Sequence, residues 1–160
     1  MTVVDRALTI RRALVADALN VHATLLTAKD DIPLRCPFDS DIYRQWVRNQ
    51  CRKRAVWVAE IGGSLAGVVV IDEVKIFYLV TVMAYRRRGV GRALVRQAVE
   101  MIQCRRHSGA TVEVWKQNLP IIELLVGEGF RPHPEQPNKP HPLLADHVPS
   151  WIVYIVGDVT

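Results

Sequence analysis

The sequence has no hydrophobic run long enough to cross a membrane. Its longest apolar run, residues 65–71, is far shorter than the roughly 20 residues that a transmembrane helix needs. Four charged residues interrupt any candidate signal peptide at the amino end: Asp5, Arg6, Arg11 and Arg12. We therefore expect a cytoplasmic protein with no membrane partner.

Cysteine is scarce, and the chain contains no CxxC pair. Cys36, Cys51 and Cys104 are widely spaced and odd in number, which argues against a zinc site or a redox centre. Free thiols, buried or half-buried, are the simpler interpretation and suit a reducing compartment. Three histidines in a proline-rich segment lack the regular spacing of metal ligands, so we expect no metal there. These are His133, His141 and His147.

The 160 residues are 49% hydrophobic and 23% charged, which predicts one ordinary domain, residues 1–160, with a real core. Much of the net charge of +5 lies in two clusters, residues 52–54 and residues 86–88 with Arg92 and Arg96 following. A basic surface suits nucleic acid or a small polyphosphate ligand. Because no recognition motif with interleaved aromatic residues is present, no nucleic-acid partner is expected.

Hydrophobic periodicity predicts a mixed α/β sheet with helices on its faces. Strands are expected at residues 8–13, 55–61, 65–71, 74–83, 111–115 and 151–156, and helices at 15–28, from a cap at Asp39 or Ser40 to 53, at 91–105 and at 119–128. Gly62 and Gly63 predict a tight turn between two strands. The strand at 74–83 is apolar on both faces, so it should lie inside the sheet. Residues 32–38 and the proline-rich segment 132–149 are expected to be loops.

The most informative segment, residues 79–94, joins a buried strand, a basic turn and an amphipathic helix. A helix amino end presents unpaired N–H groups and partial positive charge, both of which favour a phosphate. Gly89 and Gly91 would let a pyrophosphate approach the backbone, and the arginines would add charge-assisted hydrogen bonds. The segment lacks the Walker pattern and the three glycines of a Rossmann fingerprint. A charged turn whose glycines only permit the bend is the alternative.

Here the chain resembles the GCN5-related N-acetyltransferase (GNAT) family, whose coenzyme A signature Q/R-x-x-G-x-G/A is filled by Arg86, Gly89 and Gly91. The hairpin at residues 58–67 and the run at 78–81 look like its second to fourth strands. Asn118, with Gly129-Phe130 downstream, looks like its N-x-x-A-x-x-L-Y-x-x-x-G-F motif. The resemblance covers about residues 8–130. It implies a mixed, mainly antiparallel central sheet flanked by helices on both faces.

The resemblance also implies an activity: transfer of an acetyl group from acetyl-CoA, a co-substrate, to a primary amine that attacks directly in a ternary complex. The backbone of Leu79, Val80 and Thr81 would line the pantetheine arm, and one N–H there would stabilise the oxyanion. Asn118 would lie beside the coenzyme arm. Main-chain N–H groups of the turn would hold the pyrophosphate: Arg86, Arg87, Arg88, Gly89, Val90, Gly91 and Arg92.

The chain departs from the family in its proton-transfer residues. A lysine-like amine, with a pKa near 10.4, is almost wholly protonated at pH 7, so a base should help. The family tyrosine falls at Leu125 and the family glutamate at Phe77, and neither replacement can transfer a proton. Three possibilities remain: other residues transfer the protons, solvent transfers them, or the protein is a non-catalytic coenzyme A-binding regulatory module. The candidate catalytic substitutes are Glu73, beside Asp72, and Tyr78. Without a catalytic role, Glu73 would be a solvated carboxylate in a turn, and Tyr78 would be a ring packed in the core.

The sequence leaves the acceptor open among polyamine, aminoglycoside, amino acid, and protein N-terminus or lysine. The loops at residues 32–38 and 132–149 are expected to decide it. Many relatives dimerise, so a homodimer is left open as well.

Overall fold

The computed structural model describes residues 7–28, 40–135, 138–140 and 149–157. They form an eight-stranded sheet with the order β1-β2-β3-β4-β5-β8-β6, and β7 also pairs with β8. The strands are β1 (Leu8–Arg12), β2 (Val56–Ile61), β3 (Ser64–Asp72), β4 (Lys75–Thr81), β5 (Gly109–Trp115), β6 (Arg131–Pro132), β7 (Asn138–Pro140) and β8 (Pro149–Gly157). The helices are α1 (Ala18–Leu26), α2 (Asp41–Arg52), α3 (Val90–Cys104) and α4 (Leu119–Gly127), with 3₁₀ turns at Val15–Asp17 and Met83–Tyr85.

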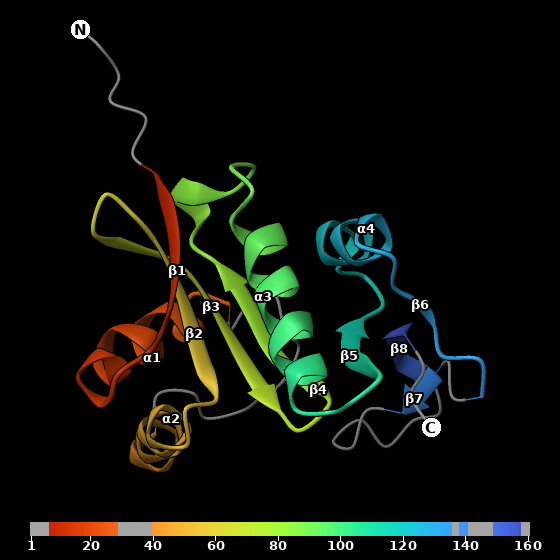
Figure 1. Ribbon diagram of the computed structural model, residues 1–160, viewed down its shortest axis with the longest axis horizontal. Helices are drawn as coiled ribbons and strands as arrows, with labels where there is room; N and C mark the ends of the chain where they lie inside the picture. The colour runs from red at the N-terminus through yellow and green to blue at the C-terminus, as the bar shows by residue number, and fades with distance from the viewer. Residues whose placement is uncertain (1–6, 29–39, 136–137, 141–148, 158–160) are drawn as a thin grey trace, which may run out of the picture.

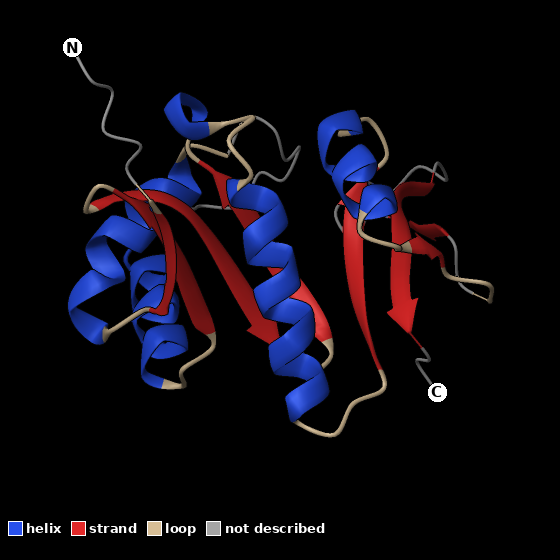
Figure 2. Ribbon diagram, turned by 45° about the horizontal axis from the view of Figure 1, so that its top comes forward, coloured by secondary structure: helices blue, strands red, loops and turns tan. Residues whose placement is uncertain are grey.

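Helices cover both faces of the sheet (Figures 1 and 2), which confirms the expected fold class. On one face α1 and α2 bury a cluster that includes Val58, Val68 and Val80. On the other face α3 and α4 bury a second cluster around Leu94 and Leu125. Among the described strands β4 and β5 pair in parallel, and the other pairs are antiparallel. The sheet is therefore mixed and mainly antiparallel.

Local signals placed several elements correctly. Gly62 and Gly63 take φ angles of 59° and 79° in the β2–β3 turn, as the tight hairpin requires. Ser40 is the N-cap of α2, and its hydroxyl accepts a hydrogen bond from the N–H of Tyr43 at 3.2 Å. Gly129, with φ 88°, follows the end of α4. Asp39 and residues 32–38 lie outside the described residues.

Two expectations need correction. The helix expected at residues 15–28 begins with a 3₁₀ turn, where the Asp17 carboxylate accepts a hydrogen bond from the N–H of Leu14 at 2.7 Å. The segment 132–149, expected to be one loop, contributes Pro132 to β6 and all of β7, which pair with β8. Short strands at a sheet edge tolerate proline, which explains why the prolines misled the prediction. His141 and His147 lie outside the described residues.

No helix within the described ranges has both the length and the apolar character that a membrane span requires. Nor do three or more His, Cys, Asp or Glu side chains gather, in the part of the chain that the structure describes, as a metal ion would need.

Candidate functional site

Strands β4 and β5 diverge soon after they meet. They pair only at Lys75–Thr111 and Ile76–Val112, although β4 pairs with β3 from Lys75 to Thr81 at every residue except Phe77. By strand order β4 is therefore interior, as expected, but its carboxyl-terminal half has an open edge. The N–H of Val82 bonds to the carbonyl of Ala66 at 2.9 Å. Because antiparallel pairing alternates, the main-chain groups of Leu79 and Thr81 point away from β3, toward the side that β5 has left.

A bend joins β4 to α3 at this open edge. Gly89 is the N-cap of α3 with φ 82°, a left-handed conformation that glycine adopts without strain. The first helical hydrogen bond runs from the N–H of Ala93 to the carbonyl of Gly89 at 3.0 Å. Within the described residues, the main-chain N–H groups of residues 87–92 make no hydrogen bond. Those of the first turn, 90–92, point out of the helix end as free donors.

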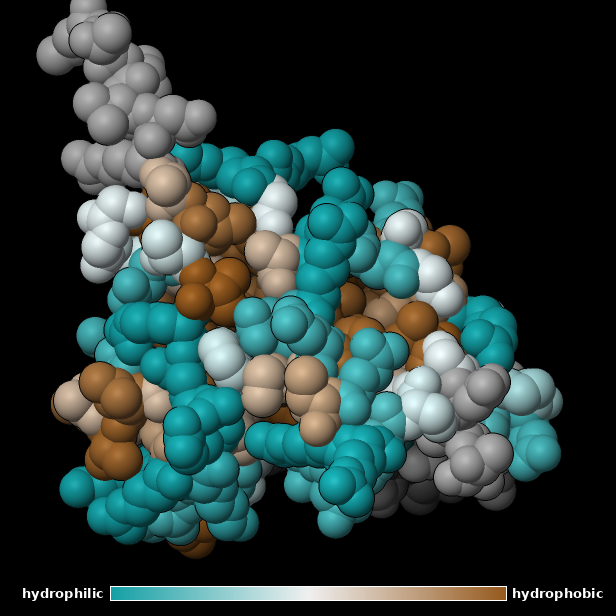
Figure 3. Space-filling view, viewed as in Figure 1, coloured by the Kyte–Doolittle hydropathy of each residue, from teal (hydrophilic) through white to brown (hydrophobic). Residues whose placement is uncertain are grey.

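The arginines of the bend differ in their partners. The Nε of Arg86 donates to the carbonyl of Thr81 at 3.4 Å and so ties the bend to the end of β4. The guanidinium of Arg88 lies 5.7 Å from the ring centre of Tyr85. The side chain of Arg92 is ion-paired, with its Nε 2.9 Å from a carboxylate oxygen of Glu128. On the face in Figure 3, hydrophilic residues cover the bend and continue along α3.

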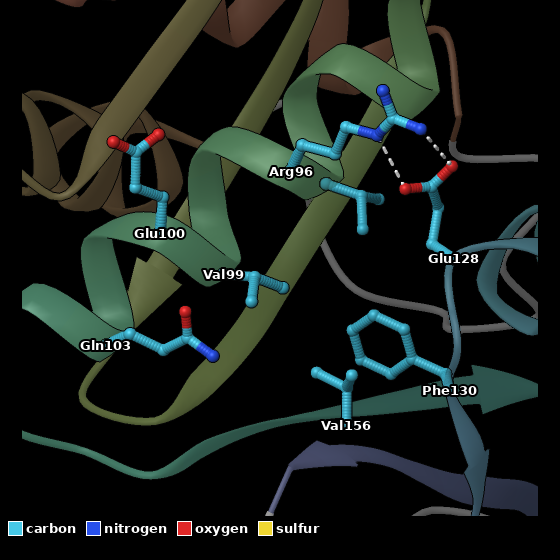
Figure 4. A pocket seen from close by; sticks show the side chains of 8 residues that line it. Arg96, Val99, Glu100, Gln103, Glu128, Phe130 and Val156 are labelled. Atoms are coloured by element: carbon cyan, nitrogen blue, oxygen red, sulfur yellow. Dashed lines mark hydrogen bonds and ion pairs between the residues drawn. The ribbon is translucent and has the colours of Figure 1, made fainter.

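Glu128 also holds Arg96, one turn further along α3, at 2.7 Å (Figure 4). Its side chain is only 10% exposed, so one largely buried carboxylate joins α3 to the end of α4. These side chains border a shallow pocket between α3 and β8 that Val99, Phe130 and Val156 also line. The pocket lies along α3, away from the bend, and contains none of the predicted site residues.

Two glycines explain how closely the elements approach. A Cβ at Gly67 in β3 would lie 2.8 Å from Val90 and 2.9 Å from the carbonyl oxygen of Val80, so α3 lies flush on the sheet only because Gly67 is there. A Cβ at Gly91 would lie 3.0 Å from Leu124 of α4. Gly91 therefore makes room for α4, whereas Gly89 has open space around it. Sequence reasoning missed the role of Gly67, although glycine within a strand is a known signal of close approach.

Asn118 lies at the same end of the sheet as the bend, where the parallel strands β4 and β5 finish. Its N–H bonds to the carbonyl of Trp115, the last residue of β5, at 2.9 Å, and it occupies the N-cap position of α4. Parallel strands end on the same side, so Asn118, three residues past the end of β5, and the bend that follows β4 lie at the same end of this strand pair. Its side chain makes no hydrogen bond within the described residues, so the amide is available to a ligand.

The two catalytic candidates have different surroundings. Glu73 is exposed, with φ 51°, in the β3–β4 turn, at the opposite end of β4 from the bend. At about 3.3 Å per residue that strand is roughly 20 Å long, so the structure does not bring Glu73 to the other site residues. Tyr78 lies beside Leu79 in the middle of β4. Leu125, at the family tyrosine position, is fully buried.

A β-bulge lies next to Tyr78. Val70 of β3 pairs with Tyr78 and Ile71 pairs with Ile76, which leaves Phe77 without a partner. A bulge redirects side chains, and Phe77 remains 39% exposed although its strand is interior. Sequence reasoning gave no sign of this bulge.

Comparisons with known proteins agree with this geometry. A family model described as the acetyltransferase (GNAT) family matches residues 24–130. An N-acetyltransferase from Staphylococcus aureus Mu50 superposes with a TM-score of 0.74 at 16% identity, covering 94% of this chain and 98% of that one. A Salmonella typhimurium protein described as an acetyltransferase, solved with its cofactor acetyl-CoA, gives 0.73 at 16% identity, covering 94% of each chain.

A ribosomal-protein-alanine N-acetyltransferase from Brucella melitensis gives a TM-score of 0.72 at 18% identity, covering 93% of this chain and 99% of that one. At such identities these structures show a shared fold. No curated protein matches the sequence. The family model covers β2 to β5, the bend and α3, and on that match the chain belongs to the GNAT acetyltransferase family.

Proposed function

We propose that this protein transfers an acetyl group from acetyl-CoA to a primary amine, which attacks directly in a ternary complex. The observation that carries the proposal is the run of free main-chain N–H groups at residues 87–92, at the amino end of α3 and beside the open edge of β4. Such a cluster of donors, with the helix dipole behind it, suits the diphosphate of coenzyme A.

Each part of the site has a role in this proposal. Acetyl-CoA supplies the acetyl group as an activated thioester. The bend at Gly89 binds the diphosphate, and the amide of Asn118 donates to the coenzyme arm from across the open edge. The N–H of Leu79 points toward that edge and orients and polarises the acetyl carbonyl as negative charge develops on its oxygen. Two of the three solved structures are named as N-acetyltransferases, and the third was solved with acetyl-CoA, which supports this choice of reaction.

The hydroxyl of Tyr78 is the proposed proton donor to the departing thiolate. It belongs to the residue next to Leu79, whereas the family tyrosine position, Leu125, is in the core. Tyr78→Phe keeps the ring and its packing, so we expect acetyl-CoA binding to persist while kcat falls by about 100-fold or more. An unchanged kcat would mean that solvent donates this proton.

Two measurements on the same protein test the proposal. Acetyl-CoA at 100 times its Kd should stabilise the fold by about 2.7 kcal/mol, seen as a raised melting temperature. A panel of amines with acetyl-CoA should then release coenzyme A thiol. Without stabilisation the proposal is wrong. Stabilisation with no thiol release across the whole panel would support a regulatory coenzyme A-binding module instead.

We also propose a reducing, cytoplasmic location. It is supported by the free thiols of Cys51 and Cys104, since disulfides are rare in that compartment.

A further inference from the structure

We propose that an aromatic wall beside the transfer point selects the acceptor, and that the acceptor is a monoamine with an aromatic or bulky apolar group near its nitrogen. The wall consists of Tyr43 and Trp46 of α2 with Phe77 and Tyr78 of β4. The inference rests on the proposed function, because it names the substrate class of that site.

The four rings form one continuous cluster. Trp46 stacks on Tyr43, with ring centres 5.4 Å apart, and meets both strand residues, Phe77 at 5.6 Å and Tyr78 at 5.9 Å. Phe77 and Tyr78 contact each other edge to face at 4.8 Å. Consecutive residues of a regular strand point to opposite faces, so the bulge at Phe77 is what brings both rings to Trp46.

One side of the wall is buried in the core, and the other side is exposed to solvent. Tyr43 is 8% exposed and packs in the α1–α2 cluster. Trp46 and Tyr78 are half-buried, and Phe77 is 39% exposed. An exposed aromatic ring on an interior strand is unusual, because the hydrophobic effect favours its burial. A ligand that covers these rings would remove that cost.

The wall lies next to the place where transfer is proposed. Phe77 and Tyr78 directly precede Leu79, whose N–H faces the open edge of β4. An amine whose nitrogen reaches the acetyl carbonyl at Leu79 would therefore lay its carbon skeleton against these rings. A bound aromatic group would gain edge-to-face contacts like those that the rings already make with one another.

The chemistry of the wall also disfavours acceptors that carry more than one positive charge. The ring of Phe77 already attracts one ammonium, since the Nζ of Lys75 lies 5.2 Å from its centre, and Lys75 is neutralised by Glu113 at 3.1 Å. None of the four wall residues is a carboxylate, so the wall itself offers no ion pair to a second or third amino group. Polyamines and aminoglycosides, which carry several, fit this surface less well than a monoamine.

The test compares phenethylamine, ethylamine and spermidine by thiol release. For the natural protein we expect kcat/KM to be at least about tenfold higher for phenethylamine than for either of the others, since one aromatic contact set is worth about 1.4 kcal/mol. Trp46→Ala should lower the phenethylamine-to-ethylamine ratio about tenfold, and Trp46→Phe should restore most of it. Phe77→Glu should move the preference toward spermidine.

Ile42→Ala is the matched control. Ile42 is on the same helix, is 84% exposed and is outside the wall, so its replacement should leave the ratio unchanged. The rise in melting temperature with acetyl-CoA should be equal in all variants, which excludes misfolding. Equal kcat/KM for the three amines, or a ratio that Trp46→Ala does not lower, would overturn the inference.

Calorimetric titration of phenethylamine into the protein with coenzyme A bound separates the two proposals. Binding that Trp46→Ala weakens, without any thiol release, would keep the wall and refute the acetyl transfer. Thiol release with spermidine as the best acceptor would keep acetyl transfer and refute the wall.

Discussion

Gly89→Asp is the sharpest perturbation of the phosphate site. Gly89 caps α3 with φ 82°, and a Cβ built there meets no atom within 4 Å. The aspartate carboxylate would occupy the space in front of the free N–H groups of residues 87–92. It would accept from those donors itself and repel any diphosphate there.

The expected magnitudes are large for binding and small for folding. A non-glycine residue in the left-handed region costs about 1–2 kcal/mol, and a negative charge at a helix amino end returns about 0.3–1 kcal/mol. Repulsion between like charges about 4 Å apart amounts to about 4 kcal/mol at an effective dielectric constant of 20. That energy corresponds to a loss of affinity for acetyl-CoA of about 1000-fold.

Thermal unfolding with and without acetyl-CoA measures both quantities. At 100 times the natural Kd, the natural protein should gain about 2.7 kcal/mol. That gain corresponds to about 5–11 °C for a chain of this size. The variant should gain about 0.1 kcal/mol or less, which is no measurable shift.

Two control variants separate strain from charge. Gly63→Asp places the same residue at φ 79° in the β2–β3 turn, also with no atom within 4 Å of the new Cβ, so it carries the strain without touching the proposed site. Gly89→Asn keeps the size and removes the charge, so it should retain part of the shift. If Gly89→Asp keeps the full shift, the diphosphate does not bind at this bend.

Three further predictions concern the fold. Gly67→Ala should lower the free energy of unfolding by about 1–3 kcal/mol, measured in urea, because the added methyl group meets α3 and a strand carbonyl. The hydrogen bond from Arg11 lowers the pKa of Asp17 below its ordinary 3.8, so this stabilisation is complete above that pH and disappears as pH falls through the lower folded value. Asp17→Asn should therefore cost about 1–2 kcal/mol at pH 7, and that cost should shrink as the pH falls below 3.8 through the lower folded pKa. Burial raises the pKa of the Cys51 thiol, so an alkylating reagent followed by peptide mass spectrometry should label exposed Cys104 first and Cys51 only on unfolding.

Features with a local cause were predictable from the sequence. The turn at Gly62-Gly63, the cap at Ser40 and the apolar stripe of α3 each depend on residues close together in the chain, and the structure has all three. The bend at Gly89 belongs to the same group, because a strand, a glycine and an amphipathic helix follow one another there. Periodicity and turn chemistry are sufficient for such elements.

Features that depend on pairing between distant segments were not predictable. The bulge at Phe77 is a mismatch between β3 and β4, and the role of Gly91 depends on Leu124 of a helix that follows much later. Glu73 is a different case, because the direction of the chain was enough to place it. A residue that precedes a strand lies at the opposite end of that strand from the bend that follows it.

The two halves of the candidate site arise from two irregularities that lie next to each other in β4. After Ile76, β4 leaves β5, and at Phe77 it slips by one residue against β3. The first change opens the edge where Leu79 presents its N–H, and the second turns two aromatic rings toward α2. A strand that kept regular pairing on both sides would satisfy that N–H within the sheet and would send one ring to each face. Removal of the bulge should therefore send the rings of Phe77 and Tyr78 to opposite faces and break up the aromatic wall.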